Sequence, residues 1–197
     1  KTLFPFKADC RLRPEGQSSQ LVWNVNEFKK YISNRARIWE FQAFLKSRCV
    51  CGDDNLFDEL INKIVEKLND IPFEKIQEEI KAMYKKAVSK EFSSMGNLFN
   101  IKKNKGSLLD IDFILDKIIL SNPPHYRACV GKSALDKIKY VCSLDKENNE
   151  LSNSAQFYLH LKVLEASIQI LFDKNNYLVP NEPLQEEALK SFLENFN

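Results

Sequence analysis

Glycine is scarce in this sequence of 197 residues, which contains only five glycines, all well separated from one another. A loop that wraps backbone amides around a triphosphate needs glycines close together, because other side chains keep the backbone away from the phosphates. The sequence therefore contains no glycine-rich phosphate-binding loop.

Metal-site signatures are also missing. The two histidines, His125 and His160, are far apart, and Cys49 and Cys51 have no matching second pair among the five cysteines. None of these residues has the spacing of a zinc site. An odd number of scattered cysteines is typical of reduced thiols, so we expect a cytoplasmic protein.

Long apolar runs are absent too, since none approaches the ~18 residues of a membrane span. The first residue is Lys1 rather than Met, and no signal-peptide pattern follows it. We therefore expect an internal piece of a longer protein that does not enter a membrane.

The remaining composition is that of an ordinary folded domain. Hydrophobic residues make up 44% of the chain, with 14 Phe among them, and charged residues make up 28%. The net charge of +2 is too small to indicate a nucleic-acid-binding protein.

The first fifty residues predict a little β structure around one helix. Leu3–Cys10 is short and apolar, as expected of a strand, and Arg13–Gly16 predicts a turn. Asn24 followed by Glu27 resembles a capping box, and we expect one helix from there to about Leu45. A second short strand is predicted at Arg48–Cys51.

The rest of the sequence has helical spacing of its apolar residues, with Asn122-Pro123-Pro124 as a stop. The sequence thus predicts a mainly α fold, a helical bundle preceded by a short β-containing segment. The expected helices are Leu56–Leu68, Phe73–Ala87, Ser107–Leu120, Ala134–Val141, Phe157–Leu171 and Leu184–Phe196.

The stretch from Asp9 to Gly16 contains the densest group of candidate functional side chains in the sequence. It puts a carboxylate, Asp9, at the end of a predicted strand and two guanidinium groups, Arg11 and Arg13, just beyond it. The acid can hold Mg²⁺ or accept a proton, and the arginines can bind phosphate oxygens. The same pattern is also common in surface ion-pair networks.

Three motifs in this order resemble the bacterial glutamine-synthetase adenylyltransferase family. The first is D-x-R-L-R-P-x-G, beginning at Asp9, and the second is W-E-x-Q-A, then Arg, then G-D. The third resembles D-I-K-x-x-x-G-G-x-x-D-I-E-F, with Asn100, Ser107 and Asp112 as departures. The matching positions of the second and third motifs are Trp39, Glu40, Gln42, Ala43, Arg48, Gly52, Asp53, Lys102, Gly106, Asp110 and Phe113.

The resemblance implies the end of a nucleotidyltransferase domain at residues 1–71 and a helical bundle domain at 72–197. The family passes AMP from ATP to a tyrosine of glutamine synthetase, and a second domain removes it by phosphorolysis. Expected cofactors and partners are therefore Mg²⁺, ATP, glutamine synthetase and the PII signalling protein.

The resemblance also assigns candidate roles. Asp9 is expected to be a Mg²⁺ ligand or base, and the phosphate-binding candidates are Arg11, Arg13, Arg48 and Lys102. Three further residues are candidates for support behind the site. Trp39 is expected in the core under the sheet, whereas Glu40 and Gln42 could orient the arginines, or merely cap the helix and solubilise its surface.

Two parts of the family's site are missing from the sequence, the Gly-Ser loop and the D-x-D metal pair, which we expect upstream of Lys1. The only D-x-D is Asp110-Ile111-Asp112, but Ser107-x-x-Asp110 looks like a helix cap, and side chains two apart on a helix diverge. We therefore expect the chain alone to be inactive.

Other interpretations remain open. The chain could come from a uridylyltransferase that acts on PII, or it could be a helical interaction module that catalyses nothing. The sequence also does not assign the chain to the adenylylating or the deadenylylating half of the family.

Overall fold

A computed structural model of the chain describes residues 13–16, 19–88, 98–104, 106–144, 149–172 and 178–180. The strand predicted at Leu3–Cys10 and the helix predicted at Leu184–Phe196 lie outside the described residues. Asp9 and Arg11 lie outside them as well.

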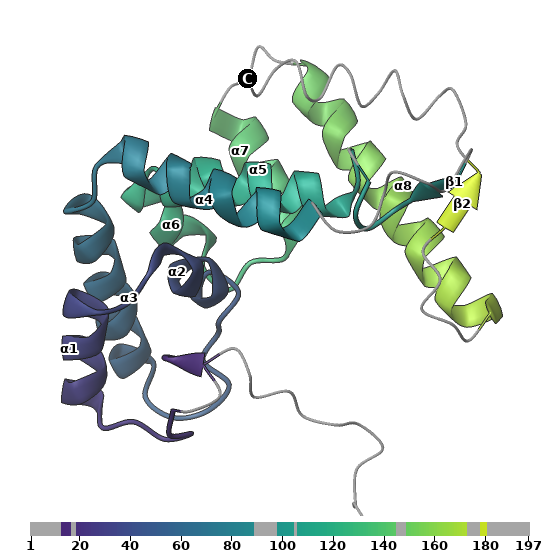
Figure 1. The fold of residues 1–197 in the computed structure, drawn as a ribbon. Coiled ribbons are helices and arrows are strands. Elements are labelled where there is room, and N and C mark those ends of the chain that lie inside the picture. The colour runs from purple at the N-terminus through teal and green to yellow at the C-terminus, as the bar shows by residue number, and fades with distance from the viewer. Residues whose placement is uncertain are drawn as a thin grey trace, which may run out of the picture.

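The mainly α prediction is confirmed (Figure 1). The helices are α1 (Val25–Asn34), α2 (Ile38–Phe44), α3 (Asp54–Asn69), α4 (Phe73–Val88), α5 (Leu108–Leu120), α6 (Pro123–Cys129), α7 (Ala134–Leu144) and α8 (Asn149–Phe172).

The β structure of the described residues lies elsewhere than predicted. Strand β1 (Leu98–Asn100) pairs antiparallel with β2 (Leu178–Pro180), which brings the chain beyond α8 back to the segment before α5. The strand predicted at Arg48–Cys51 is wrong, because this segment is irregular. It runs beside the α6–α7 turn at Gly131, whose N–H donates to Leu45 O at 3.0 Å.

Gly131 explains how closely the two segments approach. Its φ is 72°, and a Cβ added there would lie 3.0 Å from Ser47 O and 3.6 Å from Arg48 Cβ. A glycine is therefore needed at this crossing for two reasons, the positive φ and the close contact.

The single helix predicted from Asn24 to about Leu45 is in fact two helices. Asn24 caps α1 as predicted, but Arg37 is extended, with φ −107° and ψ 162°, and begins a new helix. The Glu40 carboxylate accepts the Arg37 N–H at 2.8 Å. The break lets α2 turn Ile38 and Phe41 into the core.

The prolines at 123 and 124 begin a helix rather than only ending one. Pro123 and Pro124 occupy the first turn of α6, where a missing N–H costs nothing. This short helix buries Tyr126, whose hydroxyl donates to Phe41 O at 2.9 Å.

The apolar stripes predicted for the longer helices form a shared core. In α3 the buried residues are Ile61, Ile64 and Leu68, and in α8 they include Phe157 and Leu161. Phe73, predicted at the start of a stripe, is 50% exposed. Helix α3 packs on α1 and α6, and α5 packs on α4, α6, α7 and α8. The predicted domain boundary at residue 71 stays a prediction, and one hydrophobic cluster extends across it.

In the part of the chain that the structure describes, no helix is both long enough and apolar enough to cross a membrane. Three cysteines in that part, Cys49, Cys51 and Cys129, are free thiols.

Candidate functional site

The end of the first motif forms a tight turn. Gly16 N–H donates to Arg13 O at 2.9 Å, and both Glu15 and Gly16 have positive φ, 60° and 73°. Few residues other than glycine adopt this backbone region readily, so contacts elsewhere must hold Glu15 in place.

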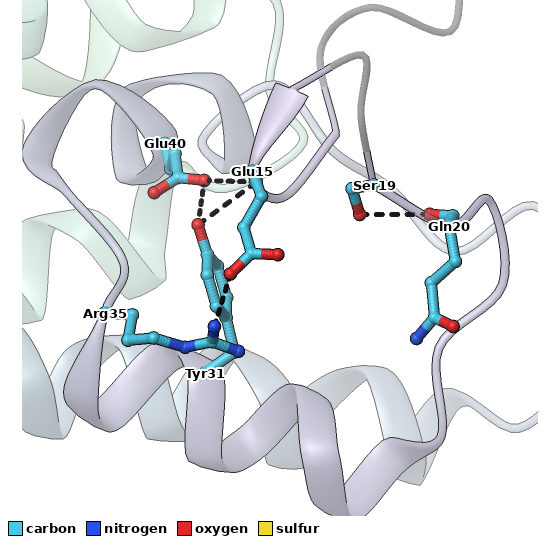
Figure 2. A network of polar contacts seen from close by, with 6 residues as sticks. All are labelled: Glu15, Ser19, Gln20, Tyr31, Arg35 and Glu40. Carbon is cyan, nitrogen blue, oxygen red and sulfur yellow. Dashed lines mark hydrogen bonds and ion pairs between the residues drawn. The ribbon is translucent and has the colours of Figure 1, made fainter.

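Glu40 and Tyr31 supply those contacts (Figure 2). Glu15 N–H lies 3.2 Å from Tyr31 Oη and 3.2 Å from Glu40 Oε1, and the Tyr31 hydroxyl donates to the same carboxylate. The Glu15 carboxylate pairs with Arg35 Nη1 at 2.5 Å. The turn at the end of the motif is therefore connected to both α1 and α2.

The Tyr31 hydroxyl stays protonated in this network. Burial, together with the hydrogen bond to Glu40, raises the pKa of Tyr31 to about 12. Tyr31 therefore acts as a permanent donor to Glu40 over the physiological pH range.

A cavity of about 320 Å³ lies beside this turn. Its wall combines residues from two of the predicted motifs, namely Arg13 from the first and Trp39, Glu40 and Gln42 from the second. Lys46 at the end of α2 also lines it. The structure thus brings four of the predicted site residues together around one space.

Trp39 is not the core residue that the sequence predicts. It is half-buried and lines the cavity, while its neighbours Ile38 and Phe41 are in the core. The break before α2 resets the helical phase, so a pattern read as one continuous helix assigns Trp39 to the wrong face.

Glu40 caps α2, one of the two roles left open for it, and both it and Gln42 make further contacts. Both oxygens of Glu40 accept hydrogen bonds, one of them from the backbone N–H of Arg37. Gln42 Nε2 donates to Asp116 Oδ2 on α5 at 2.7 Å. An action of either residue on arginine side chains stays a prediction.

Two other candidates are not part of the cavity wall. Arg48 is exposed in the irregular segment after α2. Lys102 lies between β1 and α5, with Nζ 3.1 Å from Glu165 Oε1 on α8. Burial raises the pKa of Glu165, but the hydrogen bonds and charges of Lys162 and Lys102 outweigh it, and the net pKa is lowered.

The Asp110-Ile111-Asp112 segment behaves as a helix start, as predicted. Ser107 caps α5 through Leu109 N–H at 3.3 Å, and Asp110 accepts hydrogen bonds from Gly106 N–H at 2.5 Å and from the Tyr84 hydroxyl at 2.7 Å. Asp112 lines a different cavity from Asp110. The two carboxylates therefore do not face one ion.

The described residues of the site do not fit Mg²⁺. Glu40 is the only carboxylate in the described wall of the cavity, and its oxygens already accept from Glu15, Tyr31 and Arg37. Among the described residues there is no group of three or more His, Cys, Asp or Glu that could hold a metal ion.

Asp116 is the residue that sequence reasoning missed. It is 2% exposed, and burial raises its pKa to about 6 against the opposing effects of the Gln42 hydrogen bond and of Lys46 and Lys137. A signal was present, because Asp116 lies next to Leu115 on the face of α5 that also buries Ile119. An acid on an apolar face predicts a buried polar contact.

Comparison with known proteins bears on these motifs. Residues 3–62 match the family described as glutamate-ammonia ligase adenylyltransferase, and this range contains the first two motifs. Glutamate-ammonia ligase is another name for glutamine synthetase.

Individual relatives have the same name. The chain is 30% identical over 129 residues to the bifunctional glutamine synthetase adenylyltransferase/adenylyl-removing enzyme of Aromatoleum aromaticum, which covers 64% of this chain and 13% of the relative. Enzymes of that name from two strains of Xanthomonas campestris pv. campestris are 26% identical over 188 residues, covering 93% of this chain and 20% of each relative. The resemblance found in the sequence is confirmed, and it concerns only a part of these enzymes.

Proposed function

We propose that the chain is part of an enzyme that transfers AMP between ATP and a tyrosine of glutamine synthetase, or removes AMP by phosphorolysis, and so regulates nitrogen assimilation. The observation that carries the proposal is the single cavity at which Arg13 meets Trp39, Glu40 and Gln42. These residues belong to the stretch that matches the adenylyltransferase family.

Arg13 is the phosphate-binding residue that the geometry supports best, since it lines the cavity together with Lys46. A guanidinium can donate two parallel hydrogen bonds to a phosphate group. Trp39 forms an apolar wall, on which a nucleotide base can stack. Arg11, Arg48 and Lys102 remain phosphate-binding candidates by resemblance.

Glu40 has a positioning role in this proposal. Its carboxylate holds the backbone of the turn that immediately follows Arg13, so the position of the guanidinium relative to the cavity depends on it. Gln42 connects the same helix to α5 through Asp116.

Asp9 is proposed as the Mg²⁺ ligand or base of the intact enzyme, where Mg²⁺ would neutralise charge on the phosphates of ATP. The described wall of the cavity supplies no such ligand, so the metal would depend on Asp9 and on residues other than those of that wall. We accordingly propose that the isolated chain is inactive. We further propose that the intact protein is cytoplasmic and responds to PII.

Labelled ATP provides the test. The intact protein should transfer label to glutamine synthetase in the presence of Mg²⁺. Asp9→Asn should abolish transfer, and Arg13→Gln should slow it ~10-fold to 100-fold, the effect of losing a charge-assisted hydrogen bond. Arg127→Gln, an exposed arginine of α6, is the matched control and should leave the rate unchanged.

Other outcomes would select the rival interpretations. If neither Asp9→Asn nor Arg13→Gln changes the function of the intact protein, the chain is a helical interaction module. Transfer of UMP to PII would instead identify a uridylyltransferase. AMP transfer by the isolated chain would disprove the proposed inactivity.

A further inference from the structure

A second cavity, of about 280 Å³, lies between the end of α2 and helices α5, α7 and α8. Lysines 46, 132 and 137 line it, together with Asp112 and Asp116. With the lysines protonated and both acids ionised, three positive charges face two negative ones. The wall therefore has an excess of one positive charge.

Lys137 is the unusual member of this wall. It lies on α7 and is only 4% exposed, although lysine is among the residues least often buried. Among the described residues its ammonium makes no hydrogen bond and no ion pair. A buried ammonium without a partner is costly, so a site that keeps one has a use for its charge.

Neither carboxylate of the cavity wall forms an ion pair with the ammonium of Lys137. Asp116 attracts it electrostatically but forms no ion pair with it, and Asp116 Oδ2 is already bound by Gln42 Nε2 at 2.7 Å. Burial lowers the pKa of Lys137 more than these carboxylates raise it.

The surroundings of Lys137 favour an anion. Helix α7 begins at the cavity, because Ser133 and Ala134 line it, and the start of a helix carries a partial positive charge. The Tyr158 ring of α8 also lines the cavity, and burial, aided by the charges of Asp112 and Glu165, raises its pKa to about 12. Its hydroxyl is therefore a donor.

We propose that this cavity binds a small oxyanion, a carboxylate or a phosphate, with the ammonium of Lys137 as its principal contact. Lys46 and Lys132, both exposed, would contact the anion from the rim. At about 30 Å³ for each water, the cavity has room for an anion of about five heavy atoms and several waters.

The proposed anion site is connected to the first cavity. Lys46 lines both spaces, and the hydrogen bond between Gln42 and Asp116 joins their walls. An anion that draws Lys46 toward itself therefore moves a positive charge that also lines the cavity of Trp39.

Calorimetric titration of the 197-residue chain with sodium phosphate and, separately, sodium acetate tests the proposal, with sodium chloride at equal ionic strength as the reference. At least one of the two anions should bind saturably with one site per chain. The anion that binds more tightly identifies the group, phosphate or carboxylate. AMP transfer plays no part in this measurement, so its outcome is independent of the proposed function.

Lys137→Met should weaken that binding ~10-fold to 100-fold, as expected for the loss of a hydrogen bond to a charged group. Lys139→Met, an exposed lysine on the same helix, is the matched control and should bind normally. Circular dichroism should show that Lys137→Met is folded, since an apolar side chain replaces a buried charge.

Lys46→Met provides a second variant on an exposed residue and should weaken binding several-fold. In a Trp23→Phe background Trp39 is the only tryptophan, and its fluorescence should change on saturation. Binding that does not saturate, or that is equal in Lys137→Met and Lys139→Met, would overturn the proposal.

Discussion

Glu40 and Asp116 are two equally buried acids with different surroundings, 3% and 2% exposed. Glu40 accepts hydrogen bonds from three donors, namely Tyr31 Oη and the N–H groups of Glu15 and Arg37. Among the described residues Asp116 accepts a single one, from Gln42, and its pKa is raised to about 6. Equal burial therefore does not mean equal surroundings, and at Asp116 the hydrogen bond from Gln42 does not offset the cost of burying the charge.

The two acids also differ in their roles in the structure. Glu40 joins α1, α2 and the Arg13–Gly16 turn, and two of its three donors are backbone N–H groups. Asp116 lines a cavity whose wall also includes three lysines, so its charge can respond to pH or to a bound ion. Three substitutions test this contrast.

Glu40→Ala should have the largest effect. The variant removes a carboxylate that accepts from three donors, of which only Glu15 N–H keeps a second acceptor, Tyr31 Oη. We therefore expect the free energy of unfolding to fall by about 3 kcal/mol. Urea denaturation measures this change. Glu59→Ala, which removes an exposed partner of Lys29, should cost about 0.5 kcal/mol or less. A loss below about 1 kcal/mol for Glu40→Ala would contradict the structural role given to this residue.

Asp116→Asn should show a pH-dependent effect. Because folding raises the pKa of Asp116 from 3.8 to about 6, the folded state binds a proton at this carboxylate more tightly than the unfolded state does. Asp116 therefore contributes stability that is fully present below pH 3.8 and is lost as the pH rises through about 6.

Between pH 4 and pH 7 the unfolding free energy of the wild type, relative to Asp116→Asn, should fall by about 2 kcal/mol. Denaturation at a series of pH values checks this. The exposed Asp58→Asn is the control, and a similar pH profile for both variants would show that Asp116 is not the group responsible.

Gln42→Leu should have the smallest effect on stability of the three substitutions. It removes a donor from Asp116 and so increases the contrast with Glu40, which has three donors. Removal of the hydrogen bond from Gln42 should raise the pKa of Asp116 further and lower stability at pH 7 by about 1 kcal/mol. Titration of the carboxyl carbon by NMR reports the pKa. Gln156→Leu, an exposed glutamine of α8, should leave it unchanged. An unchanged Asp116 pKa in Gln42→Leu would mean that the hydrogen bond contributes little.

The helices that the sequence predicted best are those with local signals. Asn24 and Ser107 cap α1 and α5 as expected, and the apolar spacing around Ile61 and Ile64 gives the buried face of α3. Caps and periodicity act over one or two turns, so neighbouring residues are enough to predict them.

The sequence was less informative where distant contacts decide. The break before α2 depends on Glu40, and the irregular course of the Arg48 segment depends on its crossing with Gly131. Of the candidate site, the cluster of Arg13 with the W-E-x-Q-A residues could be anticipated only through the family resemblance. Its placement around a cavity could not be read from spacing.

Composition, helix caps, apolar periodicity and three motifs were thus sufficient to give a mainly α chain and its family resemblance. Folding decided which charged groups have partners. Glu40 reaches Glu15 across 25 positions and Gln42 reaches Asp116 across 74, whereas Lys137 is buried without a partner among the described residues. The reason is physical: the free energy of a buried charge depends on the dipoles and charges within a few ångströms of it, and these come from segments far apart in the chain.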